Sequence, residues 1–342
     1  MKLFLAPKSM AVFICSFIFS IAALLLAAVM LIPSPASANT LGTDIIGLFP
    51  RDISEIAYAD LKEARQHSWF LQLQQQMLPG NYRQFEQFLR SAGVDPDTQV
   101  DEVAWGAMSP NSQHPYEIAG VALGSFSPES TEARFASQKI PNIEVHGYKL
   151  WAFGSGSGPN DIFFFFLDNN TAAFGQRDIL EKIISVRFGG AESLLSNTNL
   201  FPLINAANGS GTIWAVLDKA NTQLALHQLL PQASQFPQAS AILDRIHNME
   251  IQVEAGDGLD AKFKAICDSS EDANELAAML QGGIVMRRYQ VQQSDPVLAQ
   301  ALENVTVSPS DNNLNVEMPV TNEQLNSMIR SRTFAFPNNS GD

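Results

Sequence analysis

The chain has 342 residues, of which 46% are hydrophobic, and a formal net charge of −14 at pH 7. An apolar share this high supports a packed core and excludes a disordered protein, and the length allows two folding units or one large one. The acidic balance repels phosphate backbones, and no basic patch with interleaved aromatic residues is present. We therefore expect neither nucleic-acid binding nor tight docking on anionic lipid head groups.

The first 38 residues have the features of an export leader. Lys2 and Lys8 supply a positive start, and residues 9–32 carry no charge. Ala36 and Ala38 are the small residues that a signal peptidase needs at the −3 and −1 positions. Because the apolar run is also long enough to span a bilayer, two outcomes stay open: cleavage after Ala38, or retention as an anchor that contacts the membrane only through residues 9–32. Both outcomes put the body in the periplasm or outside the cell, tethered to the inner membrane in the second case.

The body that follows contains a single cysteine. Cys15 lies within the leader, so Cys267 has no partner in the body for an internal disulfide. Cys267 ends an expected strand over residues 262–267, and we interpret it as a small half-buried hydrophobic residue rather than a nucleophile. Stability must therefore come from packing.

The N-terminal half of the body, residues 39–195, alternates strand and helix patterns. Apolar spacing predicts helices that are interrupted by Pro79-Gly80. Ser127-Pro128-Glu129 predicts a helix start, with a hydroxyl cap, a proline at the first position and an acid in the first turn. The expected strands are 55–61, 101–108, 117–126, 143–153, 161–168 and 171–175, and the expected helices are 62–78, 81–92, one from Ser127 and 177–187.

Four consecutive phenylalanines, Phe163 to Phe166, lie in one of these strands. Neighbouring side chains in a strand point to opposite faces, so neither face of the sheet is expected to be open to water at this point. The alternative is an exposed aromatic platform for a ligand, which soluble proteins seldom present.

The C-terminal half, residues 196–336, repeats the order of the first. Residues 58–64 align with 214–220 as a strand running into a long helix, and two further pairs of landmarks follow in the same order at similar separations. These are the helix caps Ser127-Pro128-Glu129 and Ser269-Ser270-Glu271 and the turns Asp168-Asn169-Asn170 and Asp311-Asn312-Asn313. We predict an α+β fold of two tandem pseudo-repeated halves, each a mostly antiparallel sheet with helices packed on one face. Chance agreement of turn residues is the alternative, and residues 337–342 are expected to form a disordered tail.

No local motif encodes a catalytic centre, a metal site or a cofactor site. The histidines are not spaced as zinc ligands, although His67 and His227 follow the two strand–helix junctions. The glycine-rich stretch over residues 154–158 precedes a strand rather than a helix, so we expect a flexible hairpin loop and not a dinucleotide site. The complete set of histidines is His67, His114, His146, His227 and His247.

The acidic residues form two clusters, and one pair of arginines is adjacent. Asp95, Asp97, Asp101 and Glu102 lie between a helix and a strand, where weak calcium binding is the alternative to an ordinary surface loop. Glu271, Asp272 and Glu275 fall at a helix start, where acids favour the helix dipole. Arg287-Arg288 is expected in a strand, with one side chain on each face and a surface ion pair as its role.

Short motifs at both ends of the body resemble exported bacterial protein families of unknown function. The motifs are Phe49-Pro50-Arg51-Asp52 leading to Ala59-Asp60-Leu61, and Asn315-Val316-Glu317-Met318-Pro319 near the end. The resemblance implies export and the α+β layout, and it transfers no site residues.

Three functional hypotheses follow. We favour an exported cell-envelope protein that binds or scaffolds an unidentified envelope partner or ligand without catalysis. The alternative is an exported hydrolase whose site is assembled between the two halves from residues distant in sequence. The third is an anchored assembly or secretion accessory, which requires the leader to stay attached.

Overall fold

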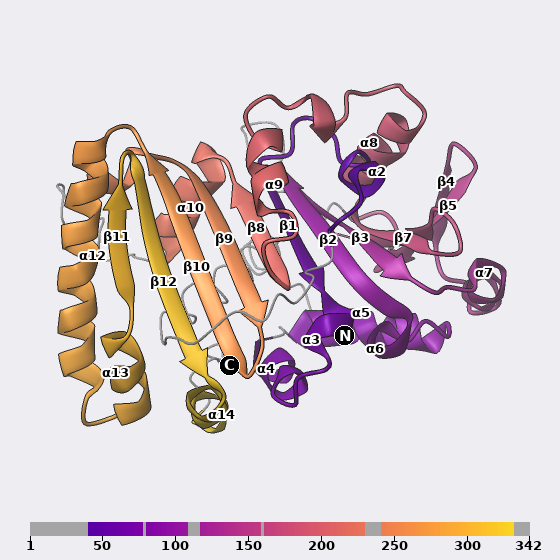
Figure 1. Ribbon diagram of the computed structural model, residues 1–342. Coiled ribbons are helices and arrows are strands. Elements are labelled where there is room, and N and C mark those ends of the chain that lie inside the picture. Colours follow the sequence, from indigo (N-terminus) through magenta and orange to yellow (C-terminus); the bar gives the residue numbers. More distant parts are fainter. Residues whose placement is uncertain (1–39, 78–79, 109–116, 159–160, 230–240, 332–342) are drawn as a thin grey trace. The chain divides into compact units, whose positions relative to one another are not determined.

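The computed structural model describes residues 40–77, 80–108, 117–158, 161–229 and 241–331 (Figure 1). The chain divides into two compact units. Of the described residues, unit 1 holds those between 40 and 62 and between 80 and 205, and unit 2 holds those between 63 and 77 and from 206 onward. The leader with Ala36 and Ala38 and the tail over 337–342 lie outside the described residues.

Unit 1 contains an antiparallel sheet in the order β1-β2-β3-β7-β6-β5-β4. Its first three strands form a meander, the chain then passes through α7 to the outer edge, and the last four strands return to pair with β3. The strands are β1 Glu55–Asp60, β2 Val100–Met108, β3 Glu117–Gly124, β4 Asn142–Val145, β5 Tyr148–Phe153, β6 Ile162–Phe166 and β7 Thr171–Gln176.

Helices cover this sheet and close its core. α8 packs against β3 and β7 through four fully buried leucine and isoleucine side chains, whereas α5 and α7 belong to an aromatic core cluster around Phe135. The helices are α2 Thr43–Ile46, α3 Leu61–Ala64, α5 Gly80–Ser91, α6 Pro96–Gln99, α7 Pro128–Ser137, α8 Arg177–Arg187, the 3-10 turn η1 Leu194–Ser196 and α9 Phe201–Ala207, of which α3 and α9 lie at the division between the units.

The four phenylalanines of β6 are buried on both faces of the sheet, with exposed fractions between 0% and 5%. Phe164 and Phe166 point into the cluster with Phe135, and the ring centroids of Phe164 and Phe135 are 6.4 Å apart. Phe165 lies on the opposite face, where its ring centroid is 5.3 Å from that of Tyr148. Both faces are therefore closed, as expected, and an exposed aromatic platform at β6 is excluded.

One expected strand, 143–153, is a hairpin of two strands, β4 and β5. His146 and Gly147 both have positive φ, +48° and +85°, and form the two-residue turn between them. Histidine is one of the non-glycine residues enriched at positive φ, and the following glycine adopts it at no steric cost, so the chain can reverse there. The sequence pattern alone does not separate the two strands because both carry apolar residues.

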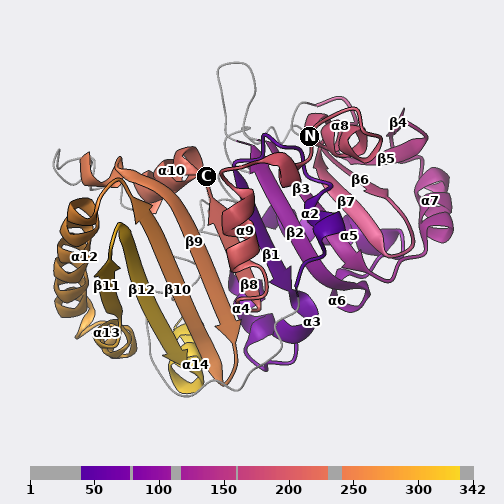
Figure 2. The same ribbon diagram turned by 45° about the horizontal axis from the view of Figure 1, so that its top comes forward.

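Unit 2 contains a five-stranded antiparallel sheet in the order β11-β12-β10-β9-β8 (Figures 1 and 2). The strands are β8 Ile213–Leu217, β9 Ile246–Ala255, β10 Gly258–Cys267, β11 Thr306–Ser310 and β12 Asn313–Thr321. The helices are α4 Phe70–Met77, α10 Lys219–Leu229, α12 Ser270–Val291, α13 Pro296–Glu303 and α14 Asn322–Arg330.

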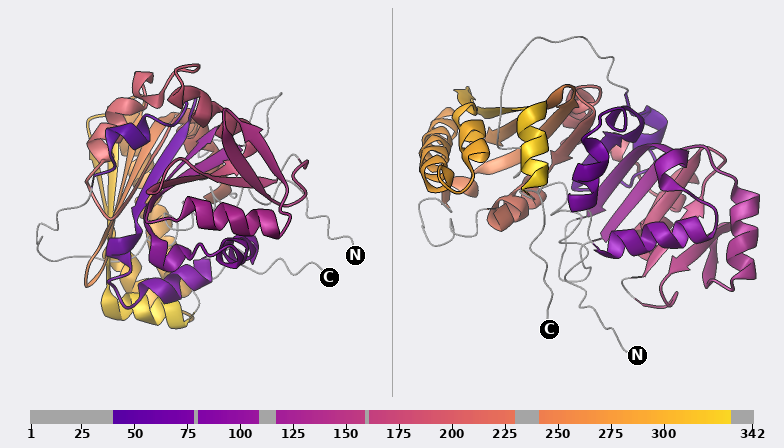
Figure 3. Two further views of the ribbon diagram at one scale, coloured as in Figure 1. Left: turned by 90° about the vertical axis from the view of Figure 1, so that its right-hand side faces the viewer. Right: turned by 90° about the horizontal axis from the view of Figure 1, so that it is seen from below.

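The two faces of the unit 2 sheet differ in character. Leu226 of α10 and Leu276 of α12 join the apolar side chains of one face in a single cluster that contains Cys267 and Leu314. The orange ribbon of α12 lies beside the strands of this sheet in the right-hand view of Figure 3. The other face of β9, β10 and β12 carries alternating polar side chains, as expected for an antiparallel sheet that is open on one side. Helices therefore cover one face of this sheet.

The model confirms the α+β class with antiparallel sheets. Both expected helix starts are present, because Ser127 precedes α7 and Ser269 precedes α12. The Ser269 hydroxyl caps α12, but the expected hydroxyl cap at Ser127 is wrong, because that side chain makes no cap hydrogen bond. Both expected turns join strands, with Asp168-Asn169-Asn170 between β6 and β7 and Asp311-Asn312 between β11 and β12. Descent of the two halves from a duplication stays a prediction.

The expectation of a strand at Arg287-Arg288 is wrong. Both arginines lie in α12, which runs without interruption from Ser270 to Val291. The stretch is rich in alanine, leucine and methionine, which are strong helix formers, and helix formation continues through Gly282 and Gly283. No helix of the described residues is long and apolar enough to cross a membrane.

Candidate functional site

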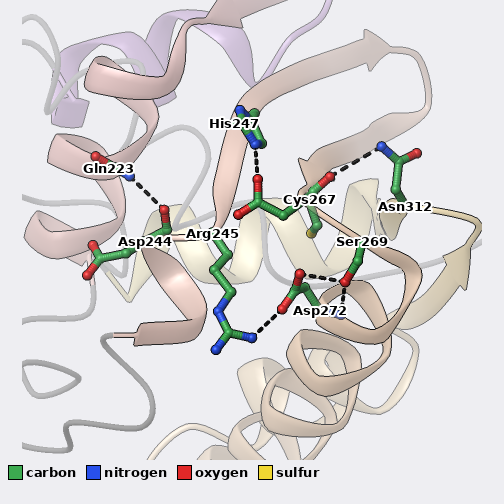
Figure 4. A network of polar contacts seen from close by, with 9 residues as sticks. Gln223, Asp244, Arg245, His247, Cys267, Ser269, Asp272 and Asn312 are labelled. Atoms are coloured by element: carbon green, nitrogen blue, oxygen red, sulfur yellow. Dashed lines mark hydrogen bonds and ion pairs between the residues drawn. The ribbon is translucent and has the colours of Figure 1, made fainter.

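Polar side chains gather where β9 begins, β10 ends and α12 starts, all within unit 2 (Figure 4). β10 ends at Cys267 beside an irregularity in its register with β9, and Asp268 then turns the chain into the cap of α12. The pairing of β9 with β10 brings Arg245 and His247 to the same place. Five side chains, Arg245, His247, Asp268, Ser269 and Asp272, form this cluster, which we call the α12 clasp.

Ser269 and Asp272 form the centre of the clasp. The Ser269 hydroxyl oxygen accepts a hydrogen bond from the Asp272 backbone N–H at 3.1 Å, and the hydroxyl donates to Oδ2 of Asp272 at 2.6 Å. Oδ1 of Asp272 accepts from the guanidinium of Arg245, so that both carboxylate oxygens are bonded. Nε2 of His247 contacts a carboxylate oxygen of Asp268 at one side.

Backbone contacts hold the clasp in register. Cys267 N–H donates to the carbonyl of Asn312 at 2.8 Å, and the Asn312 amide donates back to the carbonyl of Cys267 at 3.2 Å. Asp268 N–H donates to the carbonyl of Arg245 at 3.0 Å. The side-chain amide of Gln223 in α10 donates to the Asp244 carbonyl at 2.9 Å. The cluster thus ties α10, β9, β10 and the β11–β12 turn to the start of α12.

The electrostatics of the clasp favour fixed charges. The pKa of the Asp272 carboxyl is lowered, first by the hydrogen bond from Ser269 and then by that from Arg245. The pKa of Cys267 is raised to about 11, first by burial and then by the nearby charges of Asp272 and Asp268. The thiol, 2% exposed, is therefore protonated at neutral pH and is not an activated nucleophile.

The hydrogen bonds of the clasp do not form a nucleophile–base pair. Ser269 is bonded to Asp272, and His247 is paired with Asp268 rather than with the hydroxyl or the thiol. An activated serine or cysteine needs a hydrogen bond to its base. The arrangement therefore caps a helix and links strands, and the described residues contain no group of three or more metal-ligating side chains.

The first acidic cluster is also occupied by structural contacts. Asp95 caps α6 and, together with Asp97, forms ion pairs with Arg90. Asp101 lies 3.8 Å from the ammonium of Lys62. The residues that were candidates for calcium binding thus have a guanidinium and an ammonium beside them, and a cation competes poorly for such carboxylates.

Glu102, the last residue of that cluster, lies beside a buried tyrosine. The Tyr58 hydroxyl donates to Oε2 of Glu102 at 2.9 Å. Burial, followed by the charge of Glu102, raises the pKa of Tyr58. Burial also raises the pKa of Glu102, and the neighbouring charges of Asp60 and Asp101 add to that rise. This hydrogen bond links β1 to β2.

The histidines lie on different elements and make different contacts. His67 follows α3 in a turn and stacks on Trp69, with ring centroids 5.4 Å apart. His227 lies within α10, and the structure does not describe its side chain. His146 is at the β4–β5 turn and stacks on Phe188, while His114 lies outside the described residues.

The glycine-rich stretch over 154–158 joins β5 to β6, as expected for a hairpin loop. Its shape is set by Asp161, whose Oδ2 accepts from the Ser155 hydroxyl at 2.8 Å and from the Gly158 backbone N–H at 2.9 Å. The loop thus has no resemblance to a phosphate-binding turn at a helix N-terminus.

The open face of the unit 2 sheet is a second surface with functional potential. We call it the polar face, and it carries charged residues of both signs on neighbouring strands. Lys264 of β10 lies opposite Glu250 of β9, with 3.1 Å between ammonium and carboxylate, and Lys262 lies opposite Glu317 of β12. The Lys262 side chain is 52% exposed. The polar face consists of Glu250, Gln252, Glu254, Asp260, Lys262, Lys264, Thr306, Ser308, Asn315 and Glu317.

Sequence inspection identified Ser269 and Asp272 as a helix start but missed Arg245 and His247. Arg245 lies 27 residues before Asp272 in the chain, and His247 lies 21 residues before Asp268. Only the register of β9 with β10 reveals that they meet. A signal for such a cluster would be the combination of a predicted hairpin with polar residues at its open end.

Comparisons with known proteins leave the function open. No family model matches the chain, and no curated protein matches it. A solved structure, "Structure of crystal form I of TP0453", has a TM-score of 0.47 and 12% sequence identity, covering 87% of this chain and 99% of that chain. Crystal form IV of TP0453 has a TM-score of 0.45 and 10% identity, covering 86% of this chain and 97% of that chain. A likeness at this level carries no argument about activity.

Proposed function

We propose that this chain is an exported cell-envelope protein that acts by binding rather than by catalysis. The observation that carries the proposal is the α12 clasp, in which serine, histidine and carboxylates combine to cap a helix. An activated serine donates its hydroxyl hydrogen bond to a base, whereas the Ser269 hydroxyl donates to the Asp272 carboxylate at the start of α12 and Nε2 of His247 contacts Asp268. The lone body thiol is buried and protonated.

The polar face supports binding as the positive part of the proposal. An antiparallel surface with exposed side chains of both charges, such as Lys262 and Glu317, offers hydrogen bonds and ion pairs to a polar partner without a reaction centre. Lys262 and Glu317 are exposed side chains on adjacent strands of this face. The leader delivers the body to the compartment in which an envelope partner would be met.

Cross-linking in intact cells followed by recovery of the tagged chain tests this proposal. We expect the wild-type chain to recover a reproducible envelope partner, and the double variant Lys262→Glu, Glu317→Lys to recover less of it. Lys149→Glu, which changes an exposed lysine of β5 in unit 1, serves as the matched control and should recover as much as wild type. Lack of a reproducible partner over several conditions would contradict the binding role.

A panel of ester, peptide and glycoside substrates addresses the hydrolase alternative. We expect no turnover by the purified chain. Turnover that disappears in Ser269→Ala or His247→Ala, with the fold intact by circular dichroism, would overturn the proposal and place a reaction centre at the clasp.

A further inference from the structure

β4 leaves one edge of the unit 1 sheet open. It is the last strand of that sheet, and among the described strands it pairs with β5 alone (Figure 1). The Pro141 carbonyl accepts a hydrogen bond from the backbone of β5 at 2.8 Å. Hydrogen-bonded and non-hydrogen-bonded positions alternate along an antiparallel pair, so Ile143 and Val145 also face β5 with their backbone groups. The N–H and C=O groups of Asn142 and Glu144 therefore point to the open side, and both residues are exposed.

The outer strand of the unit 2 sheet, β11, shows how this chain protects an edge. Pro309 lies at a position of β11 whose backbone faces outward, and proline has no N–H to offer there. The side-chain amide of Gln281 in α12 donates to the outward carbonyl of Val307 at 3.3 Å. Within the described residues, β4 has neither device, because it contains no proline and no side chain bonds to its outward backbone groups. Its short length and the charge of Glu144 restrict which strand can pair with it, but they do not cover it.

Exposed apolar side chains lie beside this open edge. Ile143 and Val145 are half-buried and share one face of the sheet with Tyr148 of β5. The ring centroid of Tyr148 is 6.4 Å from that of Phe188, which directly follows α8 and is 58% exposed. The imidazole of His146 stacks on the same phenyl ring, with centroids 5.2 Å apart. We call these five side chains the edge shelf.

The open edge and the edge shelf together specify the chemistry of a partner. Backbone N–H and C=O groups at the spacing of a strand are matched by the backbone of another strand. The side chains of an added strand alternate between the two faces, so those beside Ile143 and Val145 lie on the edge shelf. The residue between them lies opposite Glu144 on the other face, where opposite charges stabilise a cross-strand pair and like charges destabilise it. The template therefore favours an extended segment with the pattern apolar, basic, apolar.

We propose that the open edge of β4 binds an extended segment of a partner polypeptide as an added strand, with two apolar side chains on the edge shelf and a basic residue opposite Glu144. A second copy of this chain matches the template less well, because β4 itself contains no basic residue and each copy carries a net charge of −14. The site belongs to unit 1 and uses no residue of the polar face, so this inference goes beyond the proposed function.

Selection from random ten-residue peptides displayed on phage tests the proposal with the purified chain. We expect the enriched peptides to share a basic residue between two apolar ones. Each enriched sequence is then made as a labelled peptide, and its affinity is measured by fluorescence polarisation. We expect a dissociation constant of about 100 μM or lower, which a few main-chain hydrogen bonds and two partly buried side chains supply.

Variants of the edge separate backbone pairing from other modes of binding. Glu144→Pro removes an outward N–H and should weaken peptide binding by about tenfold or more, with an unchanged melting temperature, because proline is tolerated where the N–H of an edge strand faces solvent. Glu144→Gln keeps the N–H and is the matched control, which should weaken binding by about fivefold or less. Phe188→Ala shortens the edge shelf at an exposed position and should weaken binding by about tenfold.

A charge reversal and hydrogen exchange complete the test, and they do not depend on the folding of Glu144→Pro. Selection on Glu144→Lys should replace the central basic residue of the enriched peptides by an acidic one. The backbone N–H of Glu144 should exchange at least about tenfold more slowly when the peptide is bound. Lack of enriched peptides, or peptides whose affinity ignores Phe188→Ala and Glu144→Lys, would overturn the proposal. Self-association of the chain that Glu144→Pro abolishes would assign the edge to a second copy and overturn it as well.

Discussion

Replacement of Ser269 by alanine tests the structural role of the α12 clasp. The variant loses the acceptor for the Asp272 backbone N–H and the hydroxyl that donates to the Asp272 carboxylate at 2.6 Å. Loss of an N-terminal helix cap costs about 1 kcal/mol and up to about 2 kcal/mol. A lost hydrogen bond to a charged group adds to that cost, but Arg245 still bonds the carboxylate. We therefore expect Ser269→Ala to lower the free energy of unfolding by about 2 kcal/mol.

Urea unfolding followed by circular dichroism provides the measurement, with m-values compared between variants. Ser127→Ala is the matched control, because Ser127 precedes α7 in the same position but its side chain makes no cap hydrogen bond. It should change the free energy of unfolding by about 0.5 kcal/mol or less. Thr321→Ala removes the cap of α14 and should cost about 1 kcal/mol. Equal losses in Ser269→Ala and Ser127→Ala would refute the argument from cap geometry.

The pH dependence of the same substitution has a definite sign. The pKa of Asp272 is lower in the folded chain than in the unfolded chain, so its contribution to stability is complete above the ordinary aspartate pKa near 3.9. The contribution is lost as the pH falls through the lower folded value. The stability difference between wild type and Asp272→Asn should therefore be constant at neutral pH and shrink in acid. A difference that grows as the pH falls would contradict this assignment.

Three further predictions concern the cores and the buried titratable groups. Phe135→Ala, at a side chain with 0% exposure, should cost about 3–5 kcal/mol in urea unfolding, whereas Phe188→Ala, 58% exposed, should cost about 0.5 kcal/mol or less. Equal costs would contradict the core assignment. In a Cys15→Ser chain, Cys267 should react with a thiol reagent at pH 8 at least about a hundredfold more slowly than in urea, because its pKa is about 11 and it is buried. Fast native labelling would contradict its burial. Glu102→Gln should raise the free energy of unfolding at pH 7, because the folded chain raises the pKa of Glu102 and so disfavours its charged form. This advantage should be lost below the ordinary glutamate pKa near 4.3. A loss of stability at pH 7 would show that the charge itself is needed by Tyr58.

Much of the fold follows from local sequence signals. The helix over 177–187 has the predicted bounds, since Gln176 ends β7 and apolar residues then recur at helical spacing. The run Phe163 to Phe166 predicts a strand that is buried on both faces, and packing on both sides confirms it. These successes share a cause, because the period of the apolar pattern and the turn residues are determined within a few neighbouring residues.

The failures have physical causes as well. The expectation of a strand at Arg287-Arg288 is wrong because the capped and alanine-rich start of α12 carries the helix through Gly282 and Gly283 to Val291. The clasp was missed because Arg245 and His247 reach it through strand pairing, which no local pattern specifies.

The central claim is the proposal that Lys2, Lys8 and the uncharged stretch over residues 9–32 send an acidic body out of the cytoplasm. Intact-mass measurement of the chain recovered from separated cell fractions tests it most directly. The account predicts a periplasmic chain that begins at Asn39, or a full-length chain held in the membrane with its body exposed to protease on the outer side. A full-length chain that is soluble in the cytosol with its leader intact would contradict it.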